Sequence, residues 1–245
     1  MKAPEISLNH VSFTYPTGTN REIISDLSTY FPAGSFSVIL GLSGSGKTTL
    51  LKLIAGIIKP SAGDIRVNGK PVENPSIQCS LLFQNSSLFP WLTIGKNIVF
   101  VLRQVKQKHR SDYIAEAKHL LHQVGLDDAY HLYPHELSGG MLRRAAFATT
   151  LAQEASIWLL DEPFSALDPP AVQRNRDLLH SIWNQGKNDK TIILVTHNVE
   201  QALTLGDTLY YLDQNGTFSH SLPTGNFSTA EKRELPTEID KWFKS

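Results

Sequence analysis

Residues 41–48 have the sequence GLSGSGKT and match the pattern G-x-x-x-x-G-K-[ST], in which each residue type suits the binding of phosphate groups. Glycines let the backbone curl so that several N–H groups point at one anion, and the following helix adds partial positive charge at its N-terminus. Lys47 would reach the β- and γ-phosphates of a nucleotide, and Thr48 would offer its hydroxyl to Mg²⁺. A glycine loop that only turns the chain is the alternative, but an apolar run before it and helical spacing after it favour phosphate binding.

An acidic pair ends a second apolar run, SIWLLDEP at residues 156–163. A phosphate loop needs a carboxylate on a neighbouring strand to hold its metal ion, and Asp161 is placed for that role, directly or through water. Glu162 would lie just beyond the strand, near the γ-phosphate, where a carboxylate can orient and polarise an attacking water. Two solvated carboxylates in a loop are the alternative, which the phosphate loop makes less favourable.

Two further polar residues end apolar runs. Gln84 closes SLLFQ and His197 closes IILVTH. Ligands of open α/β sheets bind at the carboxyl ends of the strands, so Gln84 and His197 would converge with the acidic pair on the phosphate loop. Each is weak evidence alone, since a histidine at a strand end is more often an ordinary surface residue.

A second candidate anion site lies far along the chain, in HELSGGMLRRA at residues 135–145. Ser138 would cap the helix that follows, and the two glycines after it weaken a helix start unless they bring another benefit. A plain helix cap is the alternative to an anion-binding turn.

The elements that must position these residues alternate between strands and helices. Early half-buried segments predict an antiparallel subsheet: Ile6–Tyr15 with a possible bulge near Asn9–His10, Ile23–Phe31, and a hairpin at Gly63–Val72. Near-continuous apolar runs predict buried parallel strands: Ser35–Leu40, Ile77–Gln84, Ser156–Glu162 and Lys190–His197. Helical spacing follows the phosphate loop and recurs at Thr93–Val105, Ser111–Val124, Ser138–Gln153 and Pro169–Asn184. We therefore expect an α/β fold, a P-loop NTPase core with a parallel central sheet, an N-terminal antiparallel β-subsheet and an inserted helical subdomain.

Composition excludes several classes of protein. The chain has 245 residues, with 23 Lys and Arg against 23 Asp and Glu, so charge gives no argument for nucleic-acid binding. The single cysteine, Cys79, rules out an internal disulfide and is compatible with a reducing compartment. The N-terminus lacks the apolar segment of a signal peptide, and no apolar run approaches the roughly 18 residues that span a bilayer. We expect a soluble, cytoplasmic protein that does not bind nucleic acid.

The order of these motifs resembles that of ATP-binding cassette (ABC) ATPases over nearly the whole chain, from Ile6 to about Ser221. Residues 41–49 match the phosphate loop, Gln84 falls at the Q-loop, and LSGGM at residues 137–141 resembles the signature LSGGQ, which other P-loop NTPases lack. WLLDEP resembles the Walker B motif with its catalytic glutamate, SALD at Ser165–Asp168 resembles the D-loop, and His197 matches the switch histidine.

The resemblance implies three groups of site residues and the cofactors ATP and Mg²⁺. The catalytic group is Glu162, His197 and Gln84, and the metal group is Thr48, Gln84 and Asp161. The nucleotide-binding group is Tyr15, Gly41, Ser43, Gly44, Ser45, Gly46, Lys47, Thr48, Thr49, Ser138, Gly139, Gly140 and Asp168. Tyr15 is where the family stacks an aromatic ring on adenine, and packing of that ring on the core is the alternative.

The resemblance also assigns the second anion site. In the family two cassettes pack head to tail, so Ser138, Gly139 and Gly140 would bind the γ-phosphate held by Lys47 of a second copy of the chain. Met141 departs from the signature, because it replaces the usual glutamine and cannot donate a hydrogen bond. We expect the turn to be exposed before dimerisation, and the effect of Met141 on closure of the dimer stays open.

The family resemblance implies a transporter subunit, and separate subunits are typical of bacterial importers. This sequence has no sustained heptads and one phosphate loop, unlike the repair-type members with long coiled coils and the translation-type members with two cassettes per chain. The tail of about twenty residues is shorter than the regulatory β domain that sugar importers often add. The run FPWLT at residues 89–93 resembles importers of the nitrate/sulfonate/taurine class. We expect Phe89, Pro90 and Trp91 to be exposed and to receive membrane permease subunits within Gln84–Phe100. Local packing is the alternative for Trp91.

These implications give a consistent picture with two alternatives. Residues 1–222 would form one ABC ATPase domain with a helical subdomain at roughly 90–153, and residues 223–245 a short tail with an amphipathic stretch. The subunit would lie peripherally on the cytoplasmic face of the inner membrane, in a complex that includes a substrate-binding protein. A nucleotide-dependent clamp or switch without transport is one alternative, and a cytosolic P-loop kinase is the other.

Overall fold

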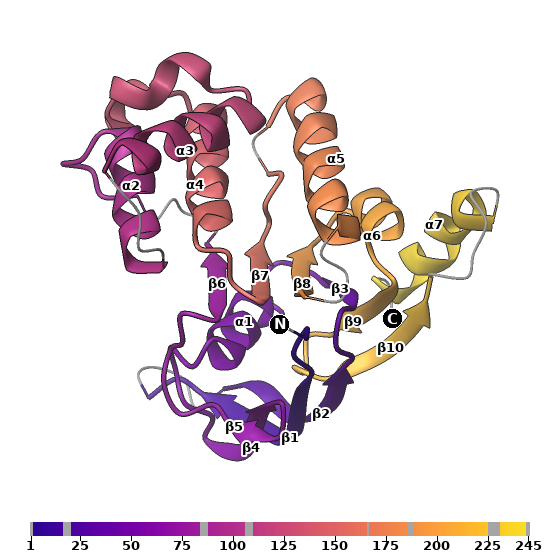
Figure 1. Ribbon diagram of the computed structural model, residues 1–245. Helices are drawn as coiled ribbons and strands as arrows, with labels where there is room; N and C mark the ends of the chain where they lie inside the picture. The colour runs from indigo at the N-terminus through magenta and orange to yellow at the C-terminus, as the bar shows by residue number, and fades with distance from the viewer. Residues whose placement is uncertain are drawn as a thin grey trace.

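The computed structural model describes residues 2–16, 21–83, 88–105, 110–165, 167–185, 189–224 and 231–243. Within these ranges the strands form a four-stranded sheet in the order β2-β1-β4-β5 and a six-stranded sheet in the order β10-β9-β3-β8-β7-β6. Figure 1 shows the smaller sheet below the larger one, with most of the helices above and to the sides.

The smaller sheet is antiparallel, as the early half-buried segments predict. It consists of β1 (Ile6–Thr14), β2 (Glu22–Phe31), β4 (Ala62–Val67) and β5 (Lys70–Pro71). The expected bulge is present, because the pairing of β1 shifts between Leu8 and Val11 and His10 has a φ of 49°. Asn68 and Gly69 both have positive φ, as a two-residue hairpin turn requires.

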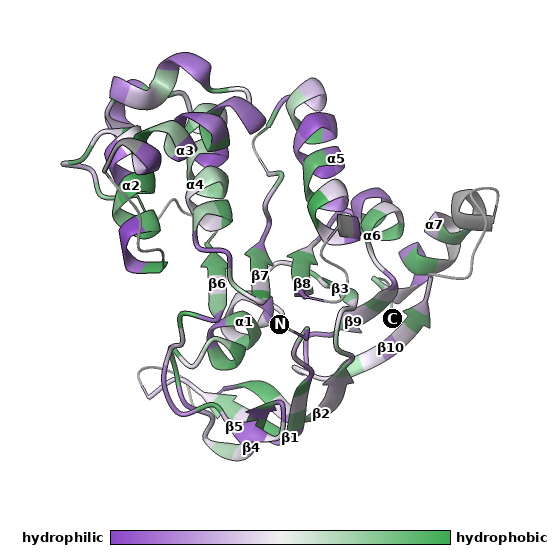
Figure 2. Ribbon diagram, in the orientation of Figure 1, coloured by the Kyte–Doolittle hydropathy of each residue, from purple (hydrophilic) through white to green (hydrophobic). Residues whose placement is uncertain are grey.

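The larger sheet carries the strands whose ends hold the candidate site. Its parallel strands are β3 (Phe36–Leu40), β6 (Cys79–Leu82), β7 (Ile157–Asp161), β8 (Thr191–Thr196) and β9 (Thr208–Leu212). An antiparallel edge strand, β10 (Phe218–Pro223), pairs with β9. Every residue of β3, β7 and β8 is buried, and Figure 2 shows β6, β7 and β8 as hydrophobic.

Between β6 and β7 the described residues contain helices and no strand. They form α2 (Ile94–Val105), α3 (Arg110–Gln123), α4 (Gly139–Ala152) and two short 3₁₀ helices, Asp127–His131 and Pro134–Glu136. The three α-helices gather on one side of the molecule (Figure 1). The expected helical insertion is therefore present.

The remaining helices are α1 (Lys47–Ile54), α5 (Pro169–Gln185), α6 (Val199–Leu205) and α7 (Glu231–Trp242). Alternate residues of the central strands bury on opposite faces: Leu160 belongs to the cluster shared with α2–α7, and Leu159 to the cluster shared with α1 and the antiparallel sheet. This places the central sheet as the middle of three layers.

The C-terminal helix α7 packs against the central sheet. Leu235 and Ile239 of α7 are buried in the first cluster, and the ring of Trp242 stacks on that of His220 with 4.9 Å between centroids. Figure 1 shows α7 beside the β9–β10 edge. Among the described residues, no helix is both long and apolar enough to cross a bilayer.

Candidate active site

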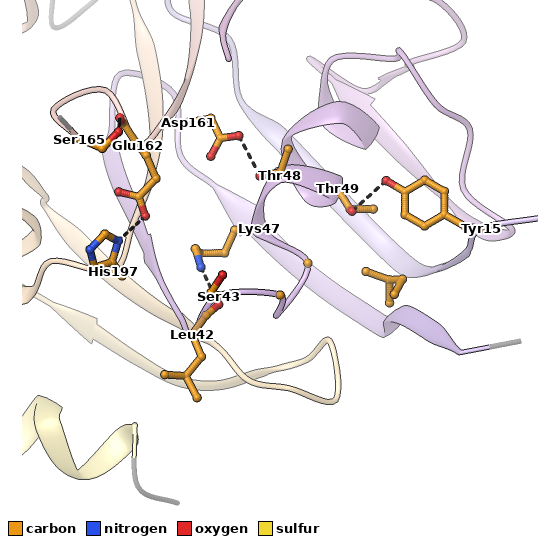
Figure 3. Close-up of a pocket in the computed structure, with 13 residues that line it drawn as sticks. Tyr15, Leu42, Ser43, Lys47, Thr48, Thr49, Asp161, Glu162, Ser165 and His197 are labelled. Atoms are coloured by element: carbon orange, nitrogen blue, oxygen red, sulfur yellow. Dashed lines mark hydrogen bonds and ion pairs between the residues drawn. The ribbon is translucent and has the colours of Figure 1, made fainter. Parts of the chain in front are cut away.

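A pocket of about 580 Å³ opens where β1, β3, β7 and β8 end (Figure 3). Its lining combines the loop after β3 with side chains from the ends of the other strands: Tyr15, Ile23, Leu42, Ser43, Gly44, Gly46, Lys47, Thr48, Thr49, Asp161, Glu162, Ser165 and His197. The predicted convergence of strand-end residues on the phosphate loop is thus present for Asp161, Glu162 and His197. Gln84 lies outside the described residues.

The loop has the conformation of an anion cradle. Gly44 and Gly46 have φ of 82° and 98°, in the left-handed region that residues other than glycine rarely adopt. A Cβ on Gly46 would also come within 3.0 Å of Ile23, whereas a Cβ on Gly44 would meet no atom within 4 Å. The Ser45 hydroxyl is buried without a hydrogen-bond partner in the described structure. Ser45 is not among the described residues that line the pocket, so its hydroxyl is no evidence for a ligand. The left-handed glycines and the open space beside Gly44 fit a loop that curls around a phosphate group.

Lys47 is held at the inner side of this loop. Only 8% of the residue is exposed, and its Nζ donates to the carbonyl oxygens of Gly41 (2.8 Å) and Leu42 (2.7 Å). Burial lowers the pKa of Lys47, and the nearby charges of Glu162 and Asp161 act in the opposite direction. In Figure 3 the ammonium lies between the acidic residues and the loop, where it can neutralise phosphate charge.

Thr48 and Asp161 form a pair of hard oxygen ligands. The Thr48 hydroxyl donates to Asp161 Oδ2 at 2.8 Å, and only 2% of Asp161 is exposed. Burial is the main cause that raises the pKa of Asp161, so a cation beside it would stabilise its charged form. In the described residues no group of three or more His, Cys, Asp and Glu side chains could hold a metal ion. A hydroxyl and a carboxylate side by side fit Mg²⁺, which takes few protein ligands and completes its shell with phosphates and water.

Glu162 and His197 face one another at the edge of the pocket (Figure 3). Glu162 Oε1 lies 2.7 Å from His197 Nδ1, and Glu162 Oε2 accepts a hydrogen bond from the Thr196 hydroxyl at 3.2 Å. The side chain of Glu162 is 12% exposed, whereas that of His197 is 69% exposed. A carboxylate held by two partners beside a phosphate cradle can orient a water molecule and accept its proton.

The backbone of Glu162 is strained. Its φ of 48° lies in the left-handed region, which costs a residue with a side chain roughly 1–2 kcal/mol. Its N–H donates to Val195 O at 3.0 Å, and its carbonyl accepts hydrogen bonds from the Ser165 hydroxyl at 3.1 Å and from the guanidinium of Arg143. Sequence reasoning did not single out Arg143, because nothing in a basic helical residue indicates a contact 19 residues away.

Tyr15 lines the pocket and also packs on its own sheet. Its hydroxyl lies 3.1 Å from the Thr49 hydroxyl, and its ring meets Phe13 edge to face with 4.8 Å between centroids. The residue remains 39% exposed. Packing on the sheet thus orients a ring that still has a free surface toward the pocket.

The second candidate anion site lies outside this pocket. Ser138 caps α4, with its hydroxyl accepting a hydrogen bond from the Met141 N–H at 3.3 Å. A Cβ on Gly139 would meet no atom within 4 Å, so the turn is open. Asp168 caps α5 through the Ala171 N–H at 2.7 Å. Neither Asp168 nor the turn at residues 138–140 lines the pocket of its own chain.

The turn is exposed at Ser138 and Gly139, as expected. The side chain of Met141 is partly buried and packs against the hydrophobic cluster that joins the helical layer to the sheet. The side chain therefore contributes to the packing of α4 against its neighbours, because a flexible thioether fills irregular space between apolar side chains.

The aromatic residues after the Gln84 segment form an exposed patch, defined here as Phe89, Trp91 and Phe100. Trp91 is 70% exposed, and its ring centroid lies 5.4 Å from that of Phe89, which in turn lies 5.1 Å from Phe100. Buried Asn97 holds the loop below them, accepting from the Phe89 N–H and donating to the Phe89, Leu92 and Thr93 carbonyls. The expected exposure of Trp91 is confirmed.

Comparison with known proteins agrees with this geometry. The family model described as ABC transporter matches residues 24–165, more than half of the chain. The taurine import ATP-binding protein TauB of Jannaschia sp. (strain CCS1) is 40% identical over 197 residues, covering 80% of this chain and 72% of that protein. The chain belongs to the ABC transporter family. Other relatives are the nitrate import ATP-binding protein NrtD of Synechocystis sp., 39% identical over 81% of this chain and 74% of its own, and the aliphatic sulfonates import ATP-binding protein SsuB of Bacillus subtilis, 36% identical over 96% and 89%.

Solved structures of ABC cassettes have the same fold. The dimeric structure of MJ0796, described as a bacterial ABC transporter cassette, superposes with a TM-score of 0.83 at 26% identity, covering 91% of this chain and all of that one. A dimeric post-hydrolysis state of the same cassette, bound to ADP and Pi, gives a TM-score of 0.82 at 27% identity. This ABC cassette is therefore an ATP-binding and ATP-hydrolysing subunit.

Proposed function

We propose that the chain energises a bacterial importer of small oxyanions and sulfonates, and that two copies close head to tail around two ATP molecules. The observation that carries this proposal is the division of the anion-binding groups. The phosphate loop and the Glu162–His197 pair share one pocket, whereas the turn at residues 138–140 lies outside it. Such a turn can serve a nucleotide when a second copy supplies that nucleotide.

Within one copy the proposed roles follow the contacts. The loop at residues 41–49 cradles the phosphates, with Gly41, Ser43, Gly44, Ser45, Gly46, Lys47 and Thr49 contributing N–H groups, hydroxyls or charge, and Tyr15 stacks on the adenine. Thr48 and Asp161 would hold Mg²⁺, whose charge would lower the barrier to phosphoryl transfer. Gln84 would coordinate the metal ion with them and form a hydrogen bond with the attacking water.

Glu162 acts as the general base in this proposal. Its carboxylate orients the attacking water and takes a proton from it, and His197 keeps the carboxylate aimed through its Nδ1 contact. Burial of the Glu162 side chain removes competing solvent, so the proton acceptor stays in one position.

The second copy completes each site. Ser138, Gly139 and Gly140 present backbone N–H groups and the positive end of α4 to the γ-phosphate on the partner, while Asp168 lies at the junction between copies. ATP thus joins two chains, and hydrolysis separates them.

The permease would dock on the patch of Phe89, Trp91 and Phe100. Such exposed aromatic residues on a loop held by buried Asn97 offer rigid apolar area to a cytoplasmic segment of an integral membrane subunit. The assembly would also contain a substrate-binding protein and sit on the cytoplasmic face of the inner membrane. Residues 1–222 would form the ATPase domain, with the helical subdomain at roughly 90–153 and the tail at 223–245.

The names of relatives support the solute class. Those proteins are named for import of taurine, nitrate and aliphatic sulfonates, all of which carry a compact anionic group. A clamp or switch that hydrolyses ATP without transport is the second candidate, and it differs by needing no membrane partner.

Reconstitution tests the proposal. Tagged chain is purified from detergent-solubilised membranes, and the complex is placed in liposomes with its binding protein. We expect a polytopic partner, and uptake of taurine, an alkanesulfonate or nitrate, but not of a neutral sugar. Trp91→Asp should abolish the association, whereas Ile77→Asp, at an equally exposed residue outside the patch, should not. ATP hydrolysis without any polytopic partner would favour the clamp.

A further inference from the structure

The carbonyl of Glu162 is anchored from the helical layer as well as from its own loop. Glu162 has a left-handed φ, so its peptide groups must be held by their surroundings. Ser165 supplies two contacts from within the loop, its N–H at 3.2 Å and its hydroxyl at 3.1 Å. Arg143 supplies a third from α4, through its Nη1.

Arg143 occupies a distinctive place on α4. It lies five residues after Ser138, the cap of the helix, or about 7 Å along the axis. Its guanidinium is half-buried and interacts electrostatically with both Asp161 and Glu162. Because a guanidinium keeps its charge and presents several donors in one plane, it can hold a carbonyl firmly in a partly desolvated position.

We propose that Arg143 is a positioning residue for ATP hydrolysis, which holds the Glu162 backbone so that the carboxylate points at the attacking water. The proposal rests on the role of Glu162 as general base. Arg143 is not among the described residues that line the nucleotide pocket, so we expect it to act on turnover rather than on ATP affinity.

Three variants separate this role from a structural one. Arg143→Met removes the donor and the charge while keeping a long side chain with good helix propensity. Arg143→Lys keeps the positive charge and an ammonium group that can donate a hydrogen bond, but loses the planar guanidinium. Arg144→Met is the matched control, because Arg144 lies on the same helix but donates to the Val124 and Gly125 carbonyls at the end of α3.

The measurements are steady-state ATP hydrolysis by the assembled transporter, ATP binding and thermal melting. We expect Arg143→Met to lower kcat roughly 10- to 100-fold, the loss typical of a hydrogen bond to a charged donor, with KM and ATP affinity changed less than about 3-fold. Arg143→Lys should recover kcat to within about 5-fold of the wild type. Arg144→Met should lower the melting temperature but keep kcat within about 3-fold.

Two results would overturn the proposal. One is a kcat for Arg143→Met within about 3-fold of the wild type. The other is an equal loss of kcat in Arg144→Met at matched stability, which would mean that any disturbance of α4 suffices. If Arg143→Met does not fold, Arg143→Ala carries the same test, since it also removes the charge and the donors and has a high helix propensity.

The Glu162→Gln background distinguishes failure of this inference from failure of the proposed function. When Glu162 is the base and Arg143 acts through it, Arg143→Met should lower the residual single-turnover rate of Glu162→Gln less than about 2-fold. A slow Glu162→Gln protein with a normal Arg143→Met protein would refute only the positioning role. A normal rate in Glu162→Gln would refute the base assignment itself.

Discussion

Replacing Glu162 with glutamine should separate catalysis from folding, because the local hydrogen bonds can survive the change. Glutamine has the same shape, and both partners of the carboxylate can still form hydrogen bonds with it. The Thr196 hydroxyl, now 3.2 Å from Oε2, can still donate to the amide oxygen, and His197 Nδ1, now 2.7 Å from Oε1, can accept from the amide N–H. The expected change in unfolding free energy is therefore within about 1 kcal/mol.

The expected change in rate is much larger. An amide cannot take a proton from water, and loss of a positioned base lowers turnover by roughly 10²- to 10⁴-fold, which corresponds to about 3–5 kcal/mol of activation free energy. The lining of the phosphate loop is untouched, so ATP binding should remain. The assay is single-turnover hydrolysis of labelled ATP by the assembled complex, with thermal melting and ATP binding measured on the same preparation.

A hydrolysis rate within about 3-fold of the wild type would refute the assignment of Glu162 as the base. His197→Ala is the companion variant, since it removes only the group that aims the carboxylate. Its rate should fall less than that of Glu162→Gln, because the carboxylate remains present with its Thr196 contact.

Two other substitutions test the elements around the site. Met141→Gln should lower the free energy of unfolding by about 1 kcal/mol and the melting temperature by roughly 2–4 °C, because the side chain packs against the hydrophobic cluster. ATP-driven dimerisation in the Glu162→Gln background should stay equal or strengthen. Sedimentation that shows clearly weaker dimers would contradict this prediction. Asn97→Ala should lower the free energy of unfolding by about 1–3 kcal/mol, because it leaves the Phe89 N–H without its hydrogen-bond acceptor. It should also weaken association with the permease. An unchanged melting temperature and unchanged association would contradict the anchoring role.

The sequence predicted the chemical core of the molecule well because its residues are constrained by local chemistry. The glycines and Lys47 of the phosphate loop, and the acidic pair at the end of β7, have few other uses in that order. Strand ends of a parallel sheet must meet at one edge, so convergence of Asp161 and His197 on the loop followed from strand assignment alone. Helix ends were also close, since Ser138 and Pro169 mark starts that the structure confirms to within a residue.

Other features depended on long-range contacts. The strands β9 and β10 and the helix α6 were missed, because five- to seven-residue segments with mixed polarity carry too little periodicity. The packing of Met141, the anchoring by Asn97 and the reach of Arg143 to Glu162 likewise depend on how the helical layer sits on the sheet. Neither spacing nor residue type along the chain records that arrangement.

The central claim is that each ATP is shared between the phosphate loop of one copy and the turn at residues 138–140 of the other. The direct measurement uses a purified heterodimer, with Lys47→Ala in one chain and Ser138→Arg in the other, and Glu162→Gln in both to block turnover. Shared sites place both defects in one site and leave the other intact, so about one ATP per heterodimer should be retained after rapid gel filtration, while homodimers of either variant retain none. If each chain instead used its own turn, both sites would be defective. An intact heterodimer that retains no ATP at saturating ATP and Mg²⁺ would contradict the account.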